Sequence, residues 1–198
     1  MFAVEGEDLV EAAAAAGVEP FELLVADGNV LPELLAEVST LGHAPRVIGV
    51  YRRADLPGGE RDAVLALWRV ADPGNVGTLL RTADAFGAGV SLSPDCADPT
   101  GPRALRASAG AIFRVPLVAW DDLPERKIAL VAHGGASLDD AELAHPLALL
   151  LGSEREGLPE SLATDCYKVT IPLPGGAESL NVAAAGAIAL YELSRRAS

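Results

Sequence analysis

Apolar residues recur along this chain in two patterns, as short continuous runs and as longer segments with one apolar face. Continuous apolar runs of about four to eight residues are typical of buried strands, whereas apolar residues at every third or fourth position are typical of amphipathic helices. The two patterns alternate along most of the chain. This alternation predicts an α/β fold.

Residues 1–56 predict a small α/β unit. Its predicted strands are FAVEG (2–6), FELLVAD (21–27) and RVIGVYRR (46–53). Its predicted helices are EDLVEAAAAAGV (7–18) and LPELLAEVSTLG (31–42). The segment RADLPGGERD (53–62) combines charge with proline and glycine, and we expect a linker there.

From residue 62 the pattern restarts and predicts a larger domain that extends to residue 198. Its predicted strands are AVLALWRV (63–70), AGVSLS (88–93), IFRVPLV (112–118), KIALVAH (127–133), LALLLG (147–152) and KVTI (168–171). Its predicted helices lie in VGTLLRTADAFG (76–87), TGPRALRASAG (100–110) and SLNVAAAGAIALYELSRR (179–196). Several strands lack polar alternation, which is typical of a parallel sheet covered on both faces. We therefore expect a mostly parallel sheet.

The net charge of −13 at pH 7 argues against nonspecific RNA binding, because a polyanion is normally bound by a basic surface. The basic residues are nearly all arginine, which binds phosphate through a planar, two-pronged contact. Arg52 and Arg53 are adjacent, and Arg103 and Arg106 are one helical turn apart. These four arginines are the candidate RNA-binding residues, as a local patch on an acidic protein.

Nothing in the sequence indicates a membrane or secreted location. No apolar run approaches the ~18 residues that span a bilayer, and the acidic start lacks the features of a signal peptide. Cys96 and Cys166 are too few for a disulfide scaffold or a zinc site. His43, His133 and His145 have no metal-ligand spacing. We expect a cytoplasmic protein that binds no metal.

Three segments carry candidate chemistry, and each follows a predicted strand. They are ADPGNVGTLLRTADAFGA (71–88), LLLGSEREGLP (149–159) and IPLPGGAESLNVAAAGAIALYE (171–192). Open α/β sheets bind ligands at the carboxyl ends of their strands, so we expect the three segments to meet. Asn75 is placed to cap the helix after the first strand, and Gly77 allows another element to approach closely.

Each candidate residue also has an ordinary structural interpretation. Asn75 is more often a helix cap than a catalytic residue, by about three to one. Arg81 alone would be a solvated or ion-paired side chain, and Glu154 an exposed loop residue. Ser179 and Asn181 would serve the first turn of the last helix. The chain has no GxGxxG, GxxxxGK[ST] or GxSxG pattern, which argues against dinucleotide, P-loop and α/β-hydrolase sites.

Together, the three segments resemble the signature motifs of the SpoU (TrmH-like) family of RNA ribose 2′-O-methyltransferases, in the SPOUT superfamily. DPGNVGTLLRTADAFG resembles the first motif, GSEREGLP the second and IPLPGGAESLNVAAAGAIALYE the third, in the family's order and spacing. RALRASAGAIFRVP is similar to an arginine-containing segment of that family. The resemblance covers about residues 62–198. FAVEGEDLVEAA is similar, more weakly, to an L30-like RNA substrate-binding domain, which would occupy residues 1–56.

The resemblance implies a deep trefoil knot in the C-terminal part of the sheet, from about Leu149 to Tyr191, although chains very rarely knot. Stiff turns of the knot would be formed by Pro172, Pro174, Gly175 and Gly176. The knot would bind S-adenosylmethionine in a bent conformation. The adenine would be held, mostly through backbone groups, by Gly152, Ile171 and Leu180. An apolar slot suits a flat adenine ring.

The reaction that the resemblance implies is methyl transfer from S-adenosylmethionine to a ribose 2′-hydroxyl, so the protein mainly positions the hydroxyl and handles one proton. Arg81 would lie nearest to the hydroxyl. A guanidinium keeps its proton up to a pH of about 12, so we favour phosphate binding and orientation over a role as general base. Asn75 would brace Arg81 or the nucleotide, and Glu154 would orient or neutralise Arg81. Ser179 and Asn181 would complete the polar pocket.

The chain departs from the family pattern at three places. Leu173 stands where a methionine is usual, and Arg103 stands where a lysine is common. Relatives with the L30-like domain begin with a basic helix, whereas this chain starts at the FAVEG strand. The last difference fits an upstream start, a trimmed chain or reduced RNA binding.

The resemblance also implies a homodimer and an RNA substrate, with ribosomal RNA favoured over transfer RNA because of the L30-like start. In the last helix, Leu190, Tyr191 and Leu193 offer more apolar surface than one domain needs to cover. Three alternatives remain open. They are a transfer RNA methyltransferase, a knotted RNA-binding homologue without activity and a Rossmann-type oxidoreductase.

Overall fold

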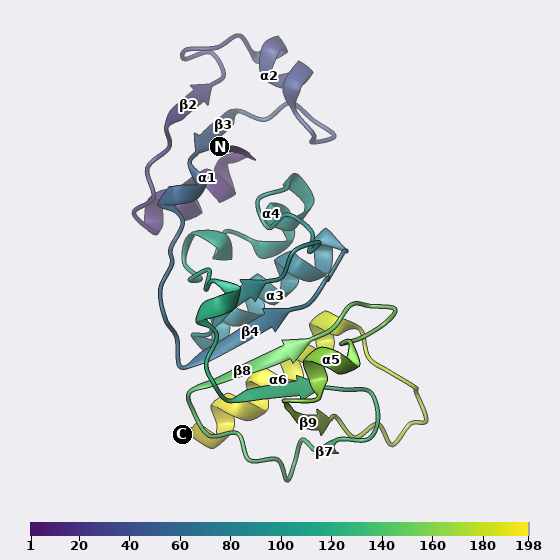
Figure 1. Cartoon of the computed structure of the whole chain (residues 1–198). Helices are drawn as coiled ribbons and strands as arrows, with labels where there is room; N and C mark the ends of the chain where they lie inside the picture. Colours follow the sequence, from purple (N-terminus) through teal and green to yellow (C-terminus); the bar gives the residue numbers. More distant parts are fainter. Residues whose placement is uncertain (198) are drawn as a thin grey trace.

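The computed structural model describes residues 1–197 and contains two β-sheets that are joined by a linker (Figure 1). The N-terminal sheet is antiparallel, with the strand order β1-β3-β2. Its elements are β1 (Phe2–Glu5), α1 (Glu7–Ala15), β2 (Glu22–Val25), α2 (Pro32–Val38) and β3 (Val47–Tyr51). All five elements predicted from this part of the sequence are therefore present. The 3-10 turn η1 (Arg53–Asp55) begins the linker.

The second sheet has six parallel strands in the order β5-β4-β8-β6-β9-β7, which confirms the predicted mostly parallel sheet. The strands are β4 (Ala63–Leu67), β5 (Gly89–Leu92), β6 (Lys127–Leu130), β7 (Ala136–Ser137), β8 (Leu147–Leu151) and β9 (Tyr167–Thr170). All five residues of β8 are buried. Leu149 and Leu151 face the main core, and Leu150 faces a second apolar cluster that contains Trp120 and Leu162. The uninterrupted apolar run of β8 follows from this burial on both faces.

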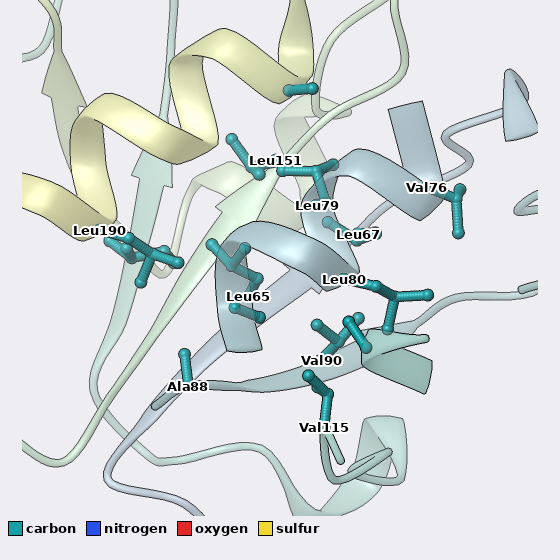
Figure 2. Close-up of a cluster of buried hydrophobic side chains, with 14 of the residues drawn as sticks. Leu65, Leu67, Val76, Leu79, Leu80, Ala88, Val90, Val115, Leu151 and Leu190 are labelled. Atoms are coloured by element: carbon teal, nitrogen blue, oxygen red, sulfur yellow. The ribbon is translucent and has the colours of Figure 1, made fainter. Parts of the chain in front are cut away.

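The helices that accompany this sheet are α3 (Pro73–Phe86), α4 (Pro102–Ser108), α5 (Glu160–Ala163) and α6 (Val182–Ala197). Figure 2 shows Leu79 of α3 beside Leu151 of the sheet, and Leu190 of α6 in the same buried cluster nearer to Leu65. Gly77 allows α4 to approach α3 closely, because a Cβ atom there would lie 2.3 Å from the carbonyl oxygen of Ala104. The close approach predicted for Gly77 is confirmed, and it serves helix packing.

The structure corrects two predicted elements. The segment 112–118 is not a strand of the sheet, because η2 (Ala111–Phe113) covers its start and Leu117 is joined only by isolated bridges, to Val90 and to Gly58. Pro116 has no N–H group to donate to a ladder, which explains the irregular backbone. The helix α2 ends at Val38, earlier than predicted. The pattern also gave no sign of β7, α5 or the 3-10 turn η3 (Trp120–Asp122).

Aromatic rings attach the N-terminal sheet to the rest of the protein. Phe2 and Tyr51 each pack against Phe113, with ring centroids 6.3 and 5.2 Å apart. Arg53 adds a two-pronged ion pair with Asp98, at 2.9 and 2.6 Å. The hydrogen bonds from Arg53 hold the pKa of Asp98 well below its usual range. These contacts fix the linker against the loop that follows β5.

We expect Tyr51→Phe to raise the free energy of unfolding by about 1 kcal/mol, measured by urea denaturation. The Tyr51 side chain is buried, and its hydroxyl has no hydrogen-bond partner among residues 1–197. Phenylalanine keeps the packing and removes the unpaired polar group. Tyr51→Leu is the control, and it should lower stability because it removes the ring. A loss of stability in Tyr51→Phe would show that the hydroxyl is satisfied in solution.

Candidate active site

The three motif segments converge at the carboxyl ends of β4 and β8. The Asn75 Nδ2 atom donates a hydrogen bond to Glu154 Oε1 at 2.9 Å. The Asn181 Nδ2 atom donates a hydrogen bond to Asn75 Oδ1 at 3.1 Å. One side chain from each segment therefore enters a single hydrogen-bonded row, as the sheet rule predicts.

The N-terminus of α3 is capped by Asp72 and not by Asn75, which corrects the prediction. The Asp72 Oδ1 atom accepts a hydrogen bond from the backbone N–H of Asn75 at 3.0 Å, and Pro73 occupies the first helical position. Proline is favoured there because its missing N–H would lack a helical partner in any case. Since Asp72 caps the helix, the side chain of Asn75 is free to join the site.

Glu154 fastens the loop after β8 to the loop after β4. Its carboxylate accepts hydrogen bonds from Asn75 and from the backbone N–H groups of Ala71 and Asp72, the latter two at 3.3 Å. Partial burial acts to raise the pKa of Glu154, but these hydrogen bonds outweigh it and the net shift is downward. Glu154 is therefore an ionised acceptor at neutral pH.

Asn181 connects the site to the last helix. Its Oδ1 atom accepts hydrogen bonds from the backbone N–H groups of Ala183 at 2.9 Å and Ala184 at 3.2 Å. This is the pattern of a helix cap, and α6 begins at Val182. The prediction that Ser179 and Asn181 lie in the first turn of this helix is therefore wrong, because both residues precede it. The cap orients the Asn181 amide towards Asn75.

A cavity of about 470 Å³ lies beside this row of side chains. It is lined by residues after β6, β8 and β9, and these include Glu154, Ser179 and Asn181. The lining also includes all three residues predicted to hold adenine, namely Gly152, Ile171 and Leu180. A volume between about 300 and 1,000 Å³ is usual for small-molecule sites. The cavity thus joins an apolar slot to the polar row.

The residues present fit S-adenosylmethionine, the cofactor that the resemblance implies. Leu130, Ile171 and Leu180 supply apolar surface for a flat adenine. The wall near Gly152 consists of backbone, because a Cβ atom at Gly152 would lie 2.1 Å from the carbonyl carbon of Gly157. The loop from residue 152 to 158 thus folds closely on itself, and its residues line the cavity.

Arg81 does not join the row of side chains. Arg81 is exposed on α3, and no hydrogen bond or ion pair connects its side chain to another residue within 1–197. The predicted contact between Glu154 and Arg81 is absent, because Glu154 is engaged by Asn75 and the backbone. Ser179 lines the cavity. Arg81 is thus free to contact a ligand that arrives from solvent.

The four arginines predicted to bind RNA are already engaged within the protein. Arg52 lies 4.5 Å from the centre of the Phe21 ring, and Arg53 pairs with Asp98. Arg103 contacts Asp72 Oδ2 at 3.4 Å, and Arg106 contacts Thr40 Oγ1 at 3.3 Å. Arg103 and Arg106 lie on α4, between the site and the N-terminal sheet. Their long contacts leave them more available to a phosphate than Arg53.

Sequence reasoning missed two residues at this site. Asp72 caps α3, and Pro73 immediately after it was the available signal. Arg155 lines the cavity, but no pattern in the sequence indicates where its side chain lies. No group of three or more histidine, cysteine, aspartate or glutamate side chains placed to hold a metal ion was found within 1–197.

We expect Glu154 to titrate at a lower pH than the freely exposed glutamates of this chain, as measured by carboxyl carbon NMR. Since its folded-state pKa is lowered, its hydrogen bonds stabilise the site above the ordinary glutamate pKa, and this contribution is lost as the pH falls through the lowered value. Glu154→Gln, which assigns the resonance, should therefore be less stable than the parent at pH 7. The difference should shrink in acid. A midpoint at or above that of the exposed glutamates would contradict the geometry.

The fold and the site define an α/β protein with a small-molecule cavity at the carboxyl ends of parallel strands. Residues 62–191 match the SpoU rRNA Methylase family, and the chain belongs to this family. The assignment confirms the resemblance seen in the motifs and replaces the oxidoreductase alternative. Among the described residues, no helix is long and apolar enough to cross a bilayer.

Relatives and solved structures extend this result. The chain is 33% identical to a 23S rRNA (guanosine-2′-O)-methyltransferase of Bacillus subtilis, over 97% of this chain and 88% of the relative. It is 33% identical to a 23S rRNA (uridine-2′-O)-methyltransferase of Streptomyces viridochromogenes, over 83% of this chain and 66% of that relative. The AdoMet-bound rRNA methyltransferase structure from Sinorhizobium meliloti has a TM-score of 0.83 at 29% identity and covers 98% of this chain and 87% of its own.

Not every relative is matched along its whole length. The chain is 39% identical to an uncharacterised tRNA/rRNA methyltransferase of Synechocystis, but it covers only 53% of that protein. The chain thus spans about half to two thirds of the length of several curated relatives.

Proposed function

We propose that this chain transfers a methyl group from S-adenosylmethionine to a ribose 2′-hydroxyl of RNA, with ribosomal RNA as the favoured substrate. One observation carries the proposal. The hydrogen-bonded row of Asn75, Glu154 and Asn181 borders a cavity that suits the methyl donor. Family membership and relatives named as 23S rRNA 2′-O-methyltransferases support ribose as the target. A transfer RNA substrate is the alternative, because other relatives are named tRNA/rRNA methyltransferases.

The bound sulfonium supplies an activated methyl group, so the protein's contribution is positioning. Leu180 and Ile171 would enclose the adenine, while the loop around Gly152 contributes backbone groups. Glu154 remains ionised and holds Asn75 in place, and Asn75 in turn aligns Asn181. Ser179 would contact the bound molecules at the mouth of the cavity. This arrangement fixes the donor before RNA binds.

Arg81 would bind the phosphate next to the target ribose and orient its hydroxyl. The exposure of Arg81 and its lack of an internal partner within 1–197 support this role. A guanidinium has N–H donors and no acceptor, so Arg81 would attract the hydroxyl oxygen without taking its proton, and the proton would pass to water. Since Glu154 does not neutralise Arg81, the full positive charge is available to the phosphate.

We also propose the C-terminal trefoil knot. The chain leaves β9, which lies beyond β6 from β8, yet α6 packs against α3 on the other side of β8. The connection from residue 171 to 181 therefore runs back past β6 to β8 at the carboxyl ends of the strands. It contains a turn in which the N–H of Gly176 donates to the carbonyl of Leu173. The same connection lines the cavity together with residues 152–158 and 130–132, so three loops surround one hollow.

Residues 1–56 would serve as the L30-like RNA-binding unit, and residues 62–198 as the methyltransferase unit. The aromatic contacts of Phe113 would hold the two units in a fixed orientation. Arg103 and Arg106 lie between them and would guide the RNA backbone towards the cavity. We propose a cytoplasmic location, because ribosomal RNA is the favoured substrate.

We expect a homodimer, to be measured as twice the chain mass by light scattering at micromolar concentration. Leu190 and Leu193, predicted to face a partner, are instead buried within the chain. Ile188 and Tyr191 of α6 and Phe86 of α3 remain exposed and offer an apolar face for a two-fold contact. Tyr191→Glu should dissociate the dimer, whereas Tyr167→Glu, at another exposed ring, should not. A monomeric mass for the parent chain would refute the dimer.

Calorimetric titration tests the proposed cofactor. We expect S-adenosylmethionine to bind with a stoichiometry of about one per chain and NAD to give no heat beyond dilution. Binding of NAD without S-adenosylmethionine would contradict the proposal.

A further inference from the structure

The loop after β8 has a charged tip, and the proposed reaction uses only Glu154 of its three residues. Its base is closed by two backbone hydrogen bonds between Ser153 and Gly157, at 3.2 and 3.0 Å, and Gly157 has the left-handed φ of +67°. Residues 154–156 form the tip. Glu154 is anchored to Asn75, and Arg155 lines the cavity. The anchored loop therefore holds the backbone of Arg155 in place.

Arg155 is unusual among the arginines because its side chain has no partner within the described residues 1–197. The chain carries 28 acidic and 15 basic residues, so carboxylates are available to pair with most of its arginines. Within residues 1–197, the arginines that make a hydrogen bond, ion pair or ring contact are Arg46, Arg52, Arg53, Arg61, Arg69, Arg103, Arg106, Arg114, Arg126, Arg195 and Arg196. Within the described part of the chain, only the side chains of Arg81 and Arg155 make none, and Arg81 already has a role in the proposed reaction.

Arg155 is also the only cationic side chain of the described residues that line the cavity. S-adenosylmethionine carries one anionic group, the carboxylate of its amino-acid end, besides its flat adenine and its cationic sulfonium and ammonium groups. The apolar part of the lining suits the adenine, and a cationic donor forms the strongest hydrogen bonds with the carboxylate. Arginine binds carboxylates through two parallel hydrogen bonds, which adds direction to the attraction.

We propose that Arg155 binds the carboxylate of the methyl donor and so fixes its amino-acid end at the mouth of the cavity. This inference rests on the proposed function, because it takes S-adenosylmethionine as the occupant of the cavity. A phosphate of the RNA is the competing anion. The cofactor is favoured because Arg155 lies in the same lining as Gly152, Ile171 and Leu180, whereas Arg103 and Arg106 of α4 are absent from the described lining.

Two related nucleosides test the contact without any catalytic step. S-adenosylhomocysteine keeps the amino-acid end, and 5′-methylthioadenosine has the same adenosine and sulfur without it. We expect Arg155→Ala to weaken calorimetric binding of S-adenosylhomocysteine by about tenfold or more, as for a lost charge-assisted hydrogen bond. Binding of 5′-methylthioadenosine should be unchanged. Arg46→Ala removes another exposed arginine far from the cavity lining and should alter neither affinity.

The outcomes separate this inference from the proposed function. If the parent chain binds both nucleosides and Arg155→Ala binds S-adenosylhomocysteine as tightly as the parent, the carboxylate contact is wrong while the cofactor site stands. An unchanged affinity together with weaker RNA binding would assign Arg155 to a phosphate of the substrate, which also overturns the inference. If the parent binds neither nucleoside, the proposed function fails and the inference fails with it.

Discussion

Replacement of Arg81 by alanine is expected to lower the rate of RNA methylation by about 10²–10⁴-fold, the usual cost of losing a positioned catalytic group. Affinity for S-adenosylmethionine should barely change, because Arg81 is absent from the described cavity lining, which includes Gly152, Ile171 and Leu180. Single-turnover methylation and calorimetry measure the two effects separately. Arg114→Ala is no suitable control, because Arg114 supports the fold through Asp84. Arg46→Ala, an exposed arginine on the N-terminal side, is the better control.

Two further variants of this experiment decide what Arg81 does. Arg81→Lys should retain part of the activity, because lysine keeps the positive charge but lacks the planar guanidinium that makes two parallel hydrogen bonds. If Arg81 positions the substrate, added guanidinium should restore part of the methylation rate of Arg81→Ala. The pH profile of the restored rate should then show no additional pKa. A rescue that rises with pH would instead identify a base. Methylation at the parent rate by Arg81→Ala would remove Arg81 from the site.

The second large effect is expected at Gly152. A methyl group there would lie 2.1 Å from the carbonyl carbon of Gly157 and 2.3 Å from the backbone nitrogen of Leu158, so the loop backbone must shift. Overpacking of this kind costs about 1–3 kcal/mol. Because the same loop forms the cavity wall, we expect Gly152→Ala to weaken S-adenosylmethionine binding by at least about tenfold. Calorimetry measures the affinity, and circular dichroism verifies that the variant is folded.

Gly175 provides a matched control for this substitution. It lies in the connection between β9 and α6, and a Cβ atom at Gly175 would meet no atom within 4 Å. Gly175→Ala should therefore bind the cofactor as the parent does. Equal affinities for the parent, Gly152→Ala and Gly175→Ala would show that the tight loop is not part of the cofactor site.

The sequence predicted the second sheet well because strands that are buried on both faces are continuous apolar runs. The strands β4 and β8 lie in the middle of the second sheet and are continuous apolar runs, so their existence and parallel pairing follow from composition alone. The edge strand β7 has only two residues and too short a pattern to detect. Pro116 interrupts the run 112–118, and its effect on strand pairing outweighed the apolar composition.

The sequence predicted which residues belong to the site better than it predicted the contacts between them. Asp72 and Asn75 are both good capping residues, and composition alone does not separate them, although Pro73 favours Asp72. The partner of Glu154 depends on how α3 is rotated and on where the loop after β8 lies. Both are tertiary features. Whether Arg81 is unpaired likewise depends on the arrangement of residues that are distant in sequence, so only the structure revealed it.

Transfer of a labelled methyl group to ribosomal RNA tests the proposed activity directly. Purified chain is incubated with S-adenosylmethionine carrying a labelled methyl group and with unmodified ribosomal RNA, and the digested nucleosides are separated by mass spectrometry. The proposed function predicts that the label appears in a 2′-O-methylated nucleoside, and that this product falls by about 10²-fold or more with Arg81→Ala. Label found only on a base, or no transfer to ribosomal or transfer RNA by a chain that binds the donor, would contradict the account.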